Sequence, residues 1–317
     1  MTFDVIVLAL APVFFVLGLG YVAGRRGMVE NHHVETLNTL VMSFALPASL
    51  FVATASATRS QMLGQAPLFA IFGGVMVLVY VGWYLIARFV LKASRADGSL
   101  QALTIAFPNL AGVGLPISSS VLGATGAVPV AVALAAGSIL VTPLTLIMLE
   151  MTTGNGDGEE MGMTRRILRA IRRAVTKPVV LAPALGIVLS LSELPLDPVL
   201  KSCLMLIGHA AAGVALFLTG LILSAQTFEI DWKVAGATGV ADIARPLIAA
   251  AIVLLLPVSS ETAKIAILLA AIPSGFFGIL FAVNYRLDSA TTGSMVTAST
   301  AFSIIPMAIA IAFLFPS

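Results

Sequence analysis

Ten separate stretches of this sequence are apolar enough to lie within a lipid bilayer as helices. A spanning helix needs about 20 predominantly apolar residues, and only the sixth stretch falls clearly short of that length. The stretches lie near 4–23, 36–55, 66–91, 101–122, 126–149, 178–192, 200–225, 234–257, 261–283 and 290–315. Charged residues make up 10% of the chain, against about 25% in soluble domains. We therefore expect an all-α integral membrane protein of about ten transmembrane helices.

Basic residues are concentrated in alternate connections between these spans. Cytoplasmic loops of membrane proteins carry an excess of Lys and Arg. Three basic residues lie on one side (Arg59, Lys201 and Lys264), and one, Arg245, lies inside a span. The other thirteen lie in or beside the connections after the odd-numbered spans: Arg25, Arg26, Arg88, Lys92, Arg95, Arg165, Arg166, Arg169, Arg172, Arg173, Lys177, Lys233 and Arg286. This bias predicts a multi-pass protein of the inner (plasma) membrane with both termini outside.

The longest polar connection divides the chain into two halves of five spans each. We expect a first five-helix repeat at 1–149, a cytoplasmic linker at 150–177 and a second repeat at 178–317. The linker ends in a basic segment, 164–177, whose apolar residues share one helical face, as in a helix that lies on an anionic membrane surface. A partner-binding helix remains an alternative for this segment. Because each half has an odd number of spans, the second repeat is inverted relative to the first.

Proline and glycine cluster at matching places in the two halves. Residues 107–116 in the fourth span hold two prolines, two glycines and an asparagine, and residues 272–278 in the ninth hold a proline, two glycines and a serine. Proline breaks a helix, and a break within a membrane is tolerated only where it is buried in protein or lines a watery cavity. Paired breaks in inverted repeats are typical of secondary transporters, whose half-helix N-termini face anionic groups. We expect the two breaks to meet, with Asn109 and Ser274 adding neutral hydrogen bonds.

The same segments resemble motifs of the auxin efflux carrier family, which includes plant PIN-type carriers and bacterial malonate and malate carriers. The resemblance is carried by four segments: 107–116, 271–285, 46–51 in span two and 215–220 in span seven. It implies the fold of bile-acid and sodium–proton carriers, with helices one, two, six and seven as a scaffold and the other six as a moving transport domain. It also implies elevator-type alternating access, a crossing of broken helices four and nine, and a homodimer formed through the scaffold. Ser274 departs from the glutamine that plant members tend to have there.

The candidate substrate-binding residues come from these four motifs. They are Pro108, Asn109, Gly112, Gly114, Pro116, Pro273, Ser274 and Gly275 at the breaks, with Ser49 and Thr219 in the scaffold motifs. The resemblance places a substrate carboxylate beside Asn109, so the expected function is transport of a small organic anion across the inner membrane. We expect no cofactor, no metal site, no catalytic residue and no nucleic-acid partner.

Two charged residues, Asp242 and Arg245, lie three positions apart in the eighth span. Ionisable residues within a membrane are costly and indicate functional sites by default. Two interpretations stay open: a mutual pair that tethers helices, or an Asp242 that binds a coupling proton or sodium ion, with Arg245 recruiting the anion. His209 is expected to be a hydrogen-bonded core residue, and His32 and His33 are expected to be solvated.

Two other classes of function fit the sequence less well. A membrane-embedded enzyme needs a nucleophile–base pair or metal ligands, and no histidine lies in a span expected to contact Ser274. An uncoupled channel or facilitator would not need paired, inverted helix breaks. Saturable, trans-stimulated uptake separates a carrier from a channel.

Overall fold

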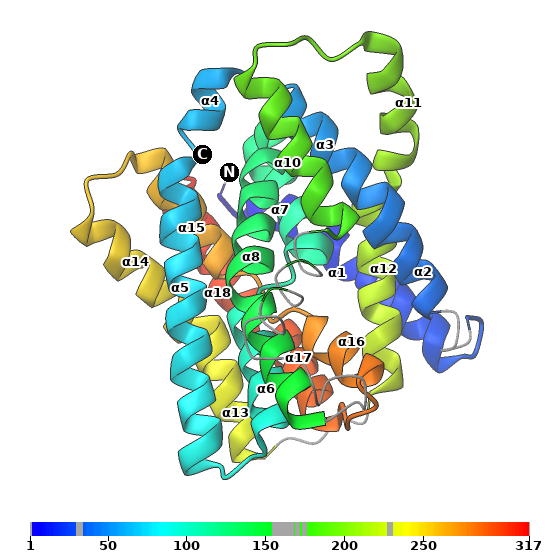
Figure 1. The fold of residues 1–317 in the computed structure, drawn as a ribbon, viewed down its shortest axis with the longest axis vertical. Coiled ribbons are helices and arrows are strands. Elements are labelled where there is room, and N and C mark those ends of the chain that lie inside the picture. The colour runs from blue at the N-terminus through cyan, green and yellow to red at the C-terminus, as the bar shows by residue number, and fades with distance from the viewer. Residues whose placement is uncertain are drawn as a thin grey trace.

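The computed structural model describes residues 2–29, 34–153, 168, 172, 176–226 and 231–316. These residues form a helical bundle with no strand among them, which confirms the predicted all-α class (Figure 1). Most of the basic segment at 164–177 lies outside the described residues, as do His32 and His33. The helices of the first half are α1 (Thr2–Arg25), α2 (Val34–Leu40), α3 (Leu46–Ala55), α4 (Arg59–Leu63), α5 (Ala66–Leu85), α6 (Arg95–Ala106), α7 (Leu115–Leu122) and α8 (Ala127–Thr153).

The second half contains another series of helices. They are α10 (Pro178–Leu191), α11 (Pro198–Gly208), α12 (Ala210–Ala225), α13 (Trp232–Gly239), α14 (Arg245–Leu255), α15 (Ser260–Ala270), α16 (Phe277–Asn284), α17 (Ala290–Phe302) and α18 (Ile304–Leu314). Short π-helical turns join several of these helices and leave them continuous. Three of them matter below: η2 (Val41–Ala45), η4 (Leu110–Gly114) and η6 (Val240–Ala244).

Within the described residues, six helical runs are long and apolar enough to cross a membrane. They are Ile6–Arg25, Val34–Ala55, Arg59–Val90, Ala127–Leu149, Pro198–Ala225 and Trp232–Leu255. Helices α17 and α18 make a seventh if their 44° bend is counted within one span. These seven coincide with the first, second, third, fifth, seventh, eighth and tenth predicted spans, so the multi-pass membrane class is supported.

The other three predicted spans are interrupted or short. The fourth stops at the end of α6 and resumes in η4 and α7, and the ninth stops at the end of α15 and resumes in α16. The interruptions contain Pro108 and Pro273, whose rings and missing N–H groups stop a helix. The sixth, α10, has 14 residues. The uninterrupted spans are therefore fewer than the apolar stretches, because two stretches break in the middle.

Two helix pairs pack with their backbones in close approach: α1 on α12, and α3 on α10. A Cβ atom at Gly20 or Gly220 would lie 2.0 or 1.9 Å from a carbonyl oxygen of the facing helix. In the second pair, a Cβ at Gly186 would lie 2.1 Å from the Thr54 hydroxyl. Small residues let membrane helices approach in this way, so van der Waals contact replaces the hydrophobic effect as the source of association.

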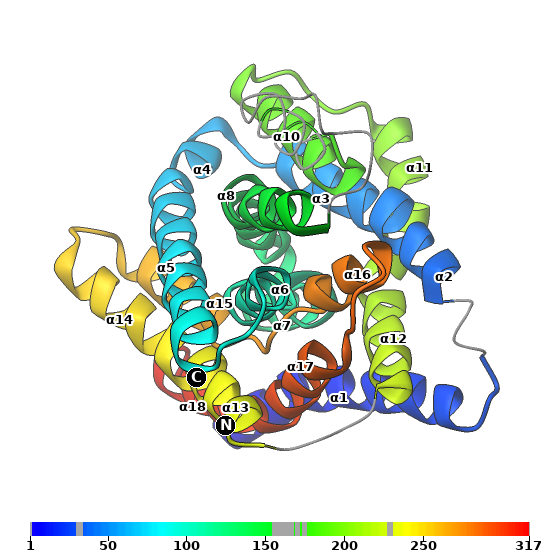
Figure 2. The ribbon, with the colours of Figure 1, turned by 60° about the horizontal axis from the view of Figure 1, so that its bottom comes forward.

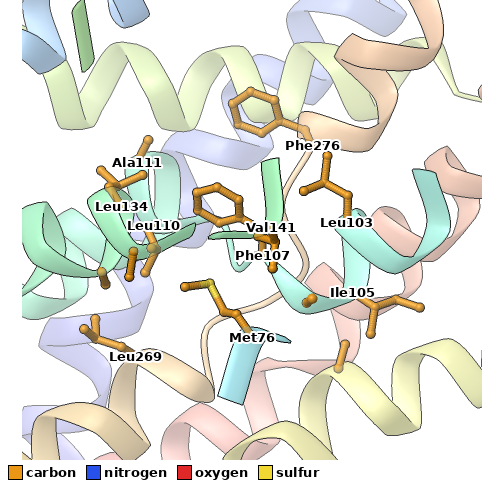
Figure 3. Close-up of a cluster of buried hydrophobic side chains, with 14 of the residues drawn as sticks. Met76, Leu103, Ile105, Phe107, Leu110, Ala111, Leu134, Val141, Leu269 and Phe276 are labelled. Atoms are coloured by element: carbon orange, nitrogen blue, oxygen red, sulfur yellow. The ribbon is translucent and has the colours of Figure 1, made fainter. Parts of the chain in front are cut away.

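The broken helices lie at the centre of the remaining bundle. Figure 2 shows α6 and α7 surrounded by α5, α8, α15, α16 and α17. A buried apolar cluster holds the first break in place, and Figure 3 shows Phe107 in it with Met76, Leu103, Leu110 and Phe276. The Phe107 ring lies against Gly137 of α8, where a Cβ would be 2.7 Å from the ring. Dense packing of this kind fixes the position of the extended segment that follows.

Candidate functional site

The two broken spans meet through a short antiparallel pairing of their extended segments. The Asn109 N–H donates to the Pro273 carbonyl oxygen at 2.8 Å, and the Gly275 N–H donates to the Phe107 carbonyl oxygen at 2.9 Å. Backbone groups released by a helix break cost several kcal/mol in a membrane unless they are satisfied. Each break therefore supplies the hydrogen-bond partners that the other break lacks.

The residue types at this crossing are the ones that such a pairing requires. Pro108 and Ser274 lie opposite each other in an isolated antiparallel bridge. A Cβ at Gly275 would lie 2.5 Å from the Phe107 carbonyl oxygen, so only glycine allows the two segments to come this close. Gly114 ends η4, and Pro116 lies in the first turn of α7, where its missing N–H costs nothing.

Asn109 joins the first break to the scaffold motif on α12. Its side-chain Oδ1 accepts a hydrogen bond from the Gly112 N–H at 3.0 Å, which caps η4, and its Nδ2 donates to the Thr219 hydroxyl at 3.3 Å. A Cβ at Gly112 would lie 2.7 Å from that hydroxyl. Asn109, Gly112 and Thr219 therefore form one buried polar cluster from segments 110 positions apart.

At the second break, Ser274 is hydrogen-bonded through its backbone but not through its side chain among the described residues. Its N–H donates to the Ser299 hydroxyl of α17 at 2.8 Å. Its own hydroxyl is buried and has no hydrogen-bond partner among the described residues. A buried unsatisfied hydroxyl costs about 1–3 kcal/mol, and such a group in a native fold requires an explanation. A bound ligand at the crossing would satisfy it.

Ser49 is the candidate that lies apart from the others. It sits on α3 against Gly208, and no hydrogen bond joins it to the Asn109 cluster within the part of the chain that the structure describes. Instead it lines the larger of two cavities. A scaffold motif in the sequence thus contributes to the wall of this cavity.

Arg245 is fully buried and is hydrogen-bonded to the backbone of both broken spans. Its Nε donates to the Ala270 carbonyl oxygen at 2.9 Å, and its other two nitrogens donate to the Ile105 and Ile272 carbonyl oxygens. These carbonyls lie where α6 and α15 end, at the negative ends of the two helix dipoles and among the carbonyls without intrahelical partners. The guanidinium offsets that negative charge. The N-terminal ends of η4 and α16 begin just beyond the same crossing, and helix N-termini are able to bind anions.

Asp242 does not share a hydrogen bond with Arg245. Its Oδ1 accepts from the Ser299 hydroxyl at 2.7 Å, and its Oδ2 has no partner among the described residues. Since the Arg245 nitrogens are committed to backbone carbonyls, the two residues do not form the mutual tether that was one of the two interpretations of the sequence. The sequence alone did not single out Ser299, because one serine in a helix rich in Ser and Thr gives no distinctive signal.

Two cavities lie toward opposite ends of the bundle. The larger, of about 1120 Å³, is lined by α3, α4, α11 and α15 and includes Lys201 and His209. The smaller, of about 650 Å³, is lined by α2, α12 and α16 and includes Lys177 and Gln226. Figure 1 shows α4 and α11 at one end and α16 toward the other. His209 is exposed at the junction of α11 and α12 and lines this cavity, so the expectation of a core histidine was wrong.

The smaller cavity holds a cation that the sequence analysis had assigned only to the linker. Lys177 caps α10, and its Nζ lies 4.8 Å from the centre of the Phe281 ring of α16, a cation–π contact. Burial lowers the pKa of this amine below its usual value. The contact joins helices that the sequence assigned to the scaffold and to the moving domain.

The sequence matches the family model described as "Membrane transport protein" over residues 5–311. It is 29% identical over 300 residues to a protein of Escherichia coli K12 named "Uncharacterized transporter YfdV", covering 93% of this chain and 92% of that protein. It is 25% identical over 296 residues to an "Uncharacterized transporter" of Methanothermobacter thermautotrophicus, covering 91% and 92%.

A further relative has a name that specifies a substrate. The "Putative malonate transporter" of Rhizobium meliloti is 25% identical over 218 residues, which cover 69% of this chain and 67% of that protein. The family match itself extends over both helix breaks and both scaffold motifs. The chain therefore belongs to the membrane transport protein family, that of the auxin efflux carriers, and is a multi-pass membrane transporter.

Proposed function

We propose that the protein is a secondary carrier that moves a small carboxylate anion across the inner membrane by elevator-type alternating access. The crossing carries this proposal. Asn109 and Ser274 belong to the two broken segments that meet there, each just before a half-helix begins, and the Ser274 hydroxyl has no partner among the described residues. Donors and positive dipole ends at a buried site are the features that bind an anion.

The substrate's carboxylate is proposed to sit at the crossing. One of its oxygens would accept from the Asn109 Nδ2, which now donates over 3.3 Å to Thr219. The other would accept from the Ser274 hydroxyl, which has no partner among the described residues. Gly112 and Gly275 allow the backbone to approach closely around these groups. The malonate named for the Rhizobium meliloti relative makes a short dicarboxylate the first substrate to test.

The packing of the helices supports an inverted repeat and a separate scaffold. Predicted span one packs on span seven as α1 on α12, and span six packs on span two as α10 on α3. An inverted repeat of 1–149 and 178–317 makes span six the counterpart of span one, and span seven the counterpart of span two. The two contacts are then symmetry equivalents of each other, as expected for ten spans with a four-helix scaffold.

The two cavities support alternating access. Each is lined by scaffold helices on one side and by helices of the proposed transport domain on the other, and neither lining includes Asn109 or Ser274. The crossing, with both residues at most 2% exposed, is closed to both cavities. Sliding of the transport domain along the scaffold would open it to one cavity and then to the other. From the distribution of basic loops, the smaller cavity is proposed to lie on the cytoplasmic side. A homodimer through the scaffold is proposed from the family resemblance.

The proposal is tested by uptake into proteoliposomes that contain the purified full-length protein. A panel of labelled mono- and dicarboxylates, malonate first, is offered with and without unlabelled acid inside. A carrier gives saturable uptake that internal substrate accelerates. Uptake that rises linearly with concentration and ignores internal substrate would indicate a channel and contradict the proposal.

A further inference from the structure

We propose that Asp242 is the site of a coupling proton and that Ser299 links its protonation to carboxylate binding at the crossing. This inference rests on the proposed function and deepens it. It assigns the co-substrate, the residue that carries it and the route by which the two binding events influence each other.

The link is a chain of two hydrogen bonds. The Ser274 N–H donates to the Ser299 oxygen at 2.8 Å, and the Ser299 hydroxyl donates to Asp242 Oδ1 at 2.7 Å. All three residues are buried. One end of the chain is therefore the backbone of the substrate site, and the other end is a carboxylate. Consecutive hydrogen bonds polarise one another in a low-dielectric interior.

The carboxylate has a free oxygen to receive the proton. Asp242 is 0% exposed, and its Oδ2 has no hydrogen-bond partner among the described residues. A buried carboxylate that is neither paired nor fully hydrogen-bonded is strongly disfavoured in its charged form. Addition of H⁺ at Oδ2 turns the carboxylate into a neutral carboxylic acid, with no other bond formed or broken. The site can therefore alternate between two charge states.

Few other charges act on Asp242. The elements packed against η6 are α6, α13, α14 and α17. Apart from Arg245, their charged residues lie in the first turn of a helix or cap it, away from η6, and α17 carries none. The charged groups are Arg95, Asp97, Asp231, Lys233 and Arg245. Arg245 is hydrogen-bonded to three carbonyls instead of to Asp242, so it does not lock the carboxylate in its ionised form.

The helix that carries Ser299 also contacts the smaller cavity. Gln226 lines that cavity, and its side chain lies against Gly293 of α17, where a Cβ would be 2.2 Å from its Oε1. On α17, the buried hydroxyls of Thr292 and Ser299 lie seven residues apart, on one face of the helix. The proton would therefore enter from the side of this cavity.

The two binding events strengthen each other. An ionised Asp242 holds the Ser299 hydroxyl in a charge-assisted hydrogen bond and places a negative charge two hydrogen bonds from the substrate site. Protonation removes that charge. The Ser299 oxygen then accepts the hydrogen bond from the Ser274 N–H more weakly, so this N–H becomes available to the substrate carboxylate. By reciprocity, a bound carboxylate favours the proton equally. One proton would then cross with the anion, in symport.

A proton fits the site better than a sodium ion does. Sodium requires several oxygen ligands, but the Ser299 oxygen nearest the carboxylate already accepts one hydrogen bond and donates another. No group of three or more acidic, histidine or cysteine side chains converges anywhere in the described residues.

The first test asks whether Asp242 takes up a proton, and it needs no substrate. Infrared spectra of the full-length protein in lipid are recorded over a pH titration. We expect a carboxylic-acid carbonyl band that disappears in Asp242→Asn and changes frequency in Ser299→Ala, because the hydrogen-bond donor is lost. Glu193→Gln, at a side chain that is 67% exposed, is the matched control and keeps the band. A band that survives in Asp242→Asn, or the absence of a titrating band in the native protein, would overturn the proposal.

The second test uses malonate in proteoliposomes. In the native protein, a pH gradient should drive malonate accumulation at zero sodium gradient. Asp242→Asn should lose this accumulation and still exchange internal for external malonate, because a neutral side chain imitates the protonated carrier. Glu193→Gln should accumulate malonate like the native protein.

The two tests fail in distinguishable ways. The coupling role would be overturned if Asp242→Asn accumulated as much malonate as the native protein. It would also be overturned if only a sodium gradient drove accumulation. If the native protein exchanges no malonate or other carboxylate, the proposed function fails. The infrared titration still decides in that case whether Asp242 binds a proton.

Discussion

At the scale of single residues, the crossing combines satisfied and unsatisfied groups. Asn109 and Arg245 complete the hydrogen bonding of the broken backbone, whereas the Ser274 hydroxyl and Asp242 Oδ2 are left without partners among the described residues. Natural folds rarely keep buried groups unsatisfied, and functional sites are where they do so. The two unsatisfied groups at the crossing are the ones proposed to bind a substrate and a proton.

Replacement of Ser274 by alanine should change stability and affinity in opposite directions. The variant loses a buried hydroxyl that has no partner among the described residues, so the free energy of unfolding should stay equal or rise by up to about 1 kcal/mol. The same change removes a proposed ligand of the carboxylate, so KM for malonate should rise roughly tenfold. Thermal unfolding in detergent and uptake kinetics check the two effects. Ser60→Ala, at an exposed serine of α4, should change neither.

Arg245 should be essential for folding of the crossing. Arg245→Ala leaves three buried carbonyls without their donors, at a cost of about 3–5 kcal/mol. Arg245→Lys should recover only part of this stability, because an ammonium group lacks the planar arrangement of donors that reaches all three carbonyls. Arg59→Ala is the control, since its ion pair with Glu193 is largely exposed and contributes about 0–1 kcal/mol. Equal melting temperatures for Arg245→Ala and Arg59→Ala would refute this role.

At the scale of helices, the close pairs define a framework of their own. The α1–α12 pair depends on glycine at the contact, since a Cβ at Gly20 would meet the backbone of α12 at 2.0 Å. Gly18, two residues earlier on the same helix, has open space around it. The two positions therefore separate the effect of helix contact from the effect of glycine itself.

Gly20→Ala and Gly18→Ala should have opposite effects on stability. Alanine at Gly20 forces the helices apart and should lower stability by about 1–3 kcal/mol. Alanine at Gly18 should leave stability equal or raise it by up to about 1 kcal/mol, because alanine is the better helix former. Melting temperatures of the two purified variants give the comparison, and a destabilised Gly18→Ala would show that this account of the helix contact is incomplete.

The sequence predicted the helical elements well but not the details of the contacts between them. Hydropathy located the spans, because each span lies within the apolar interior of the bilayer. Proline together with glycine located the two breaks. The partners of Arg245 lie in segments 25, 27 and 140 positions away and are backbone carbonyls, which leave no mark on the sequence. Ser299 lies in a helix with many similar residues, and Gln226 lies just beyond the end of α12. Their roles come from three-dimensional packing and could not be read from spacing.

At the scale of the whole molecule, the proposal requires two bodies that move past each other. Cavities toward opposite ends of the bundle are each lined by both bodies, and the crossing lies in neither lining. Contacts between the bodies must therefore break during transport, and contacts within the scaffold must not. Gln226 against Gly293 is a contact of the first kind, and Thr54 against Gly186 is one of the second.

Cysteine pairs at these two contacts should differ in their effect on transport. In a Cys203→Ser background, which removes an exposed free thiol, a disulfide between Gln226→Cys and Gly293→Cys should stop malonate uptake until a reductant is added. A disulfide between Thr54→Cys and Gly186→Cys should leave uptake intact, because both helices belong to the proposed scaffold. Inhibition by the second pair, or uninhibited transport by a fully cross-linked first pair, would contradict the division into moving and fixed bodies.

Carboxylate binding at the crossing is the step on which the proposed transport depends. It is tested most directly by labelled malonate uptake into proteoliposomes with native protein and with Asn109→Ala, verified as folded by its melting temperature. Loss of the Asn109 amide should reduce uptake at low malonate by about tenfold or more, because a hydrogen bond to a charged group contributes about 1.5–3 kcal/mol. Equal uptake by a folded Asn109→Ala would show that the substrate binds elsewhere.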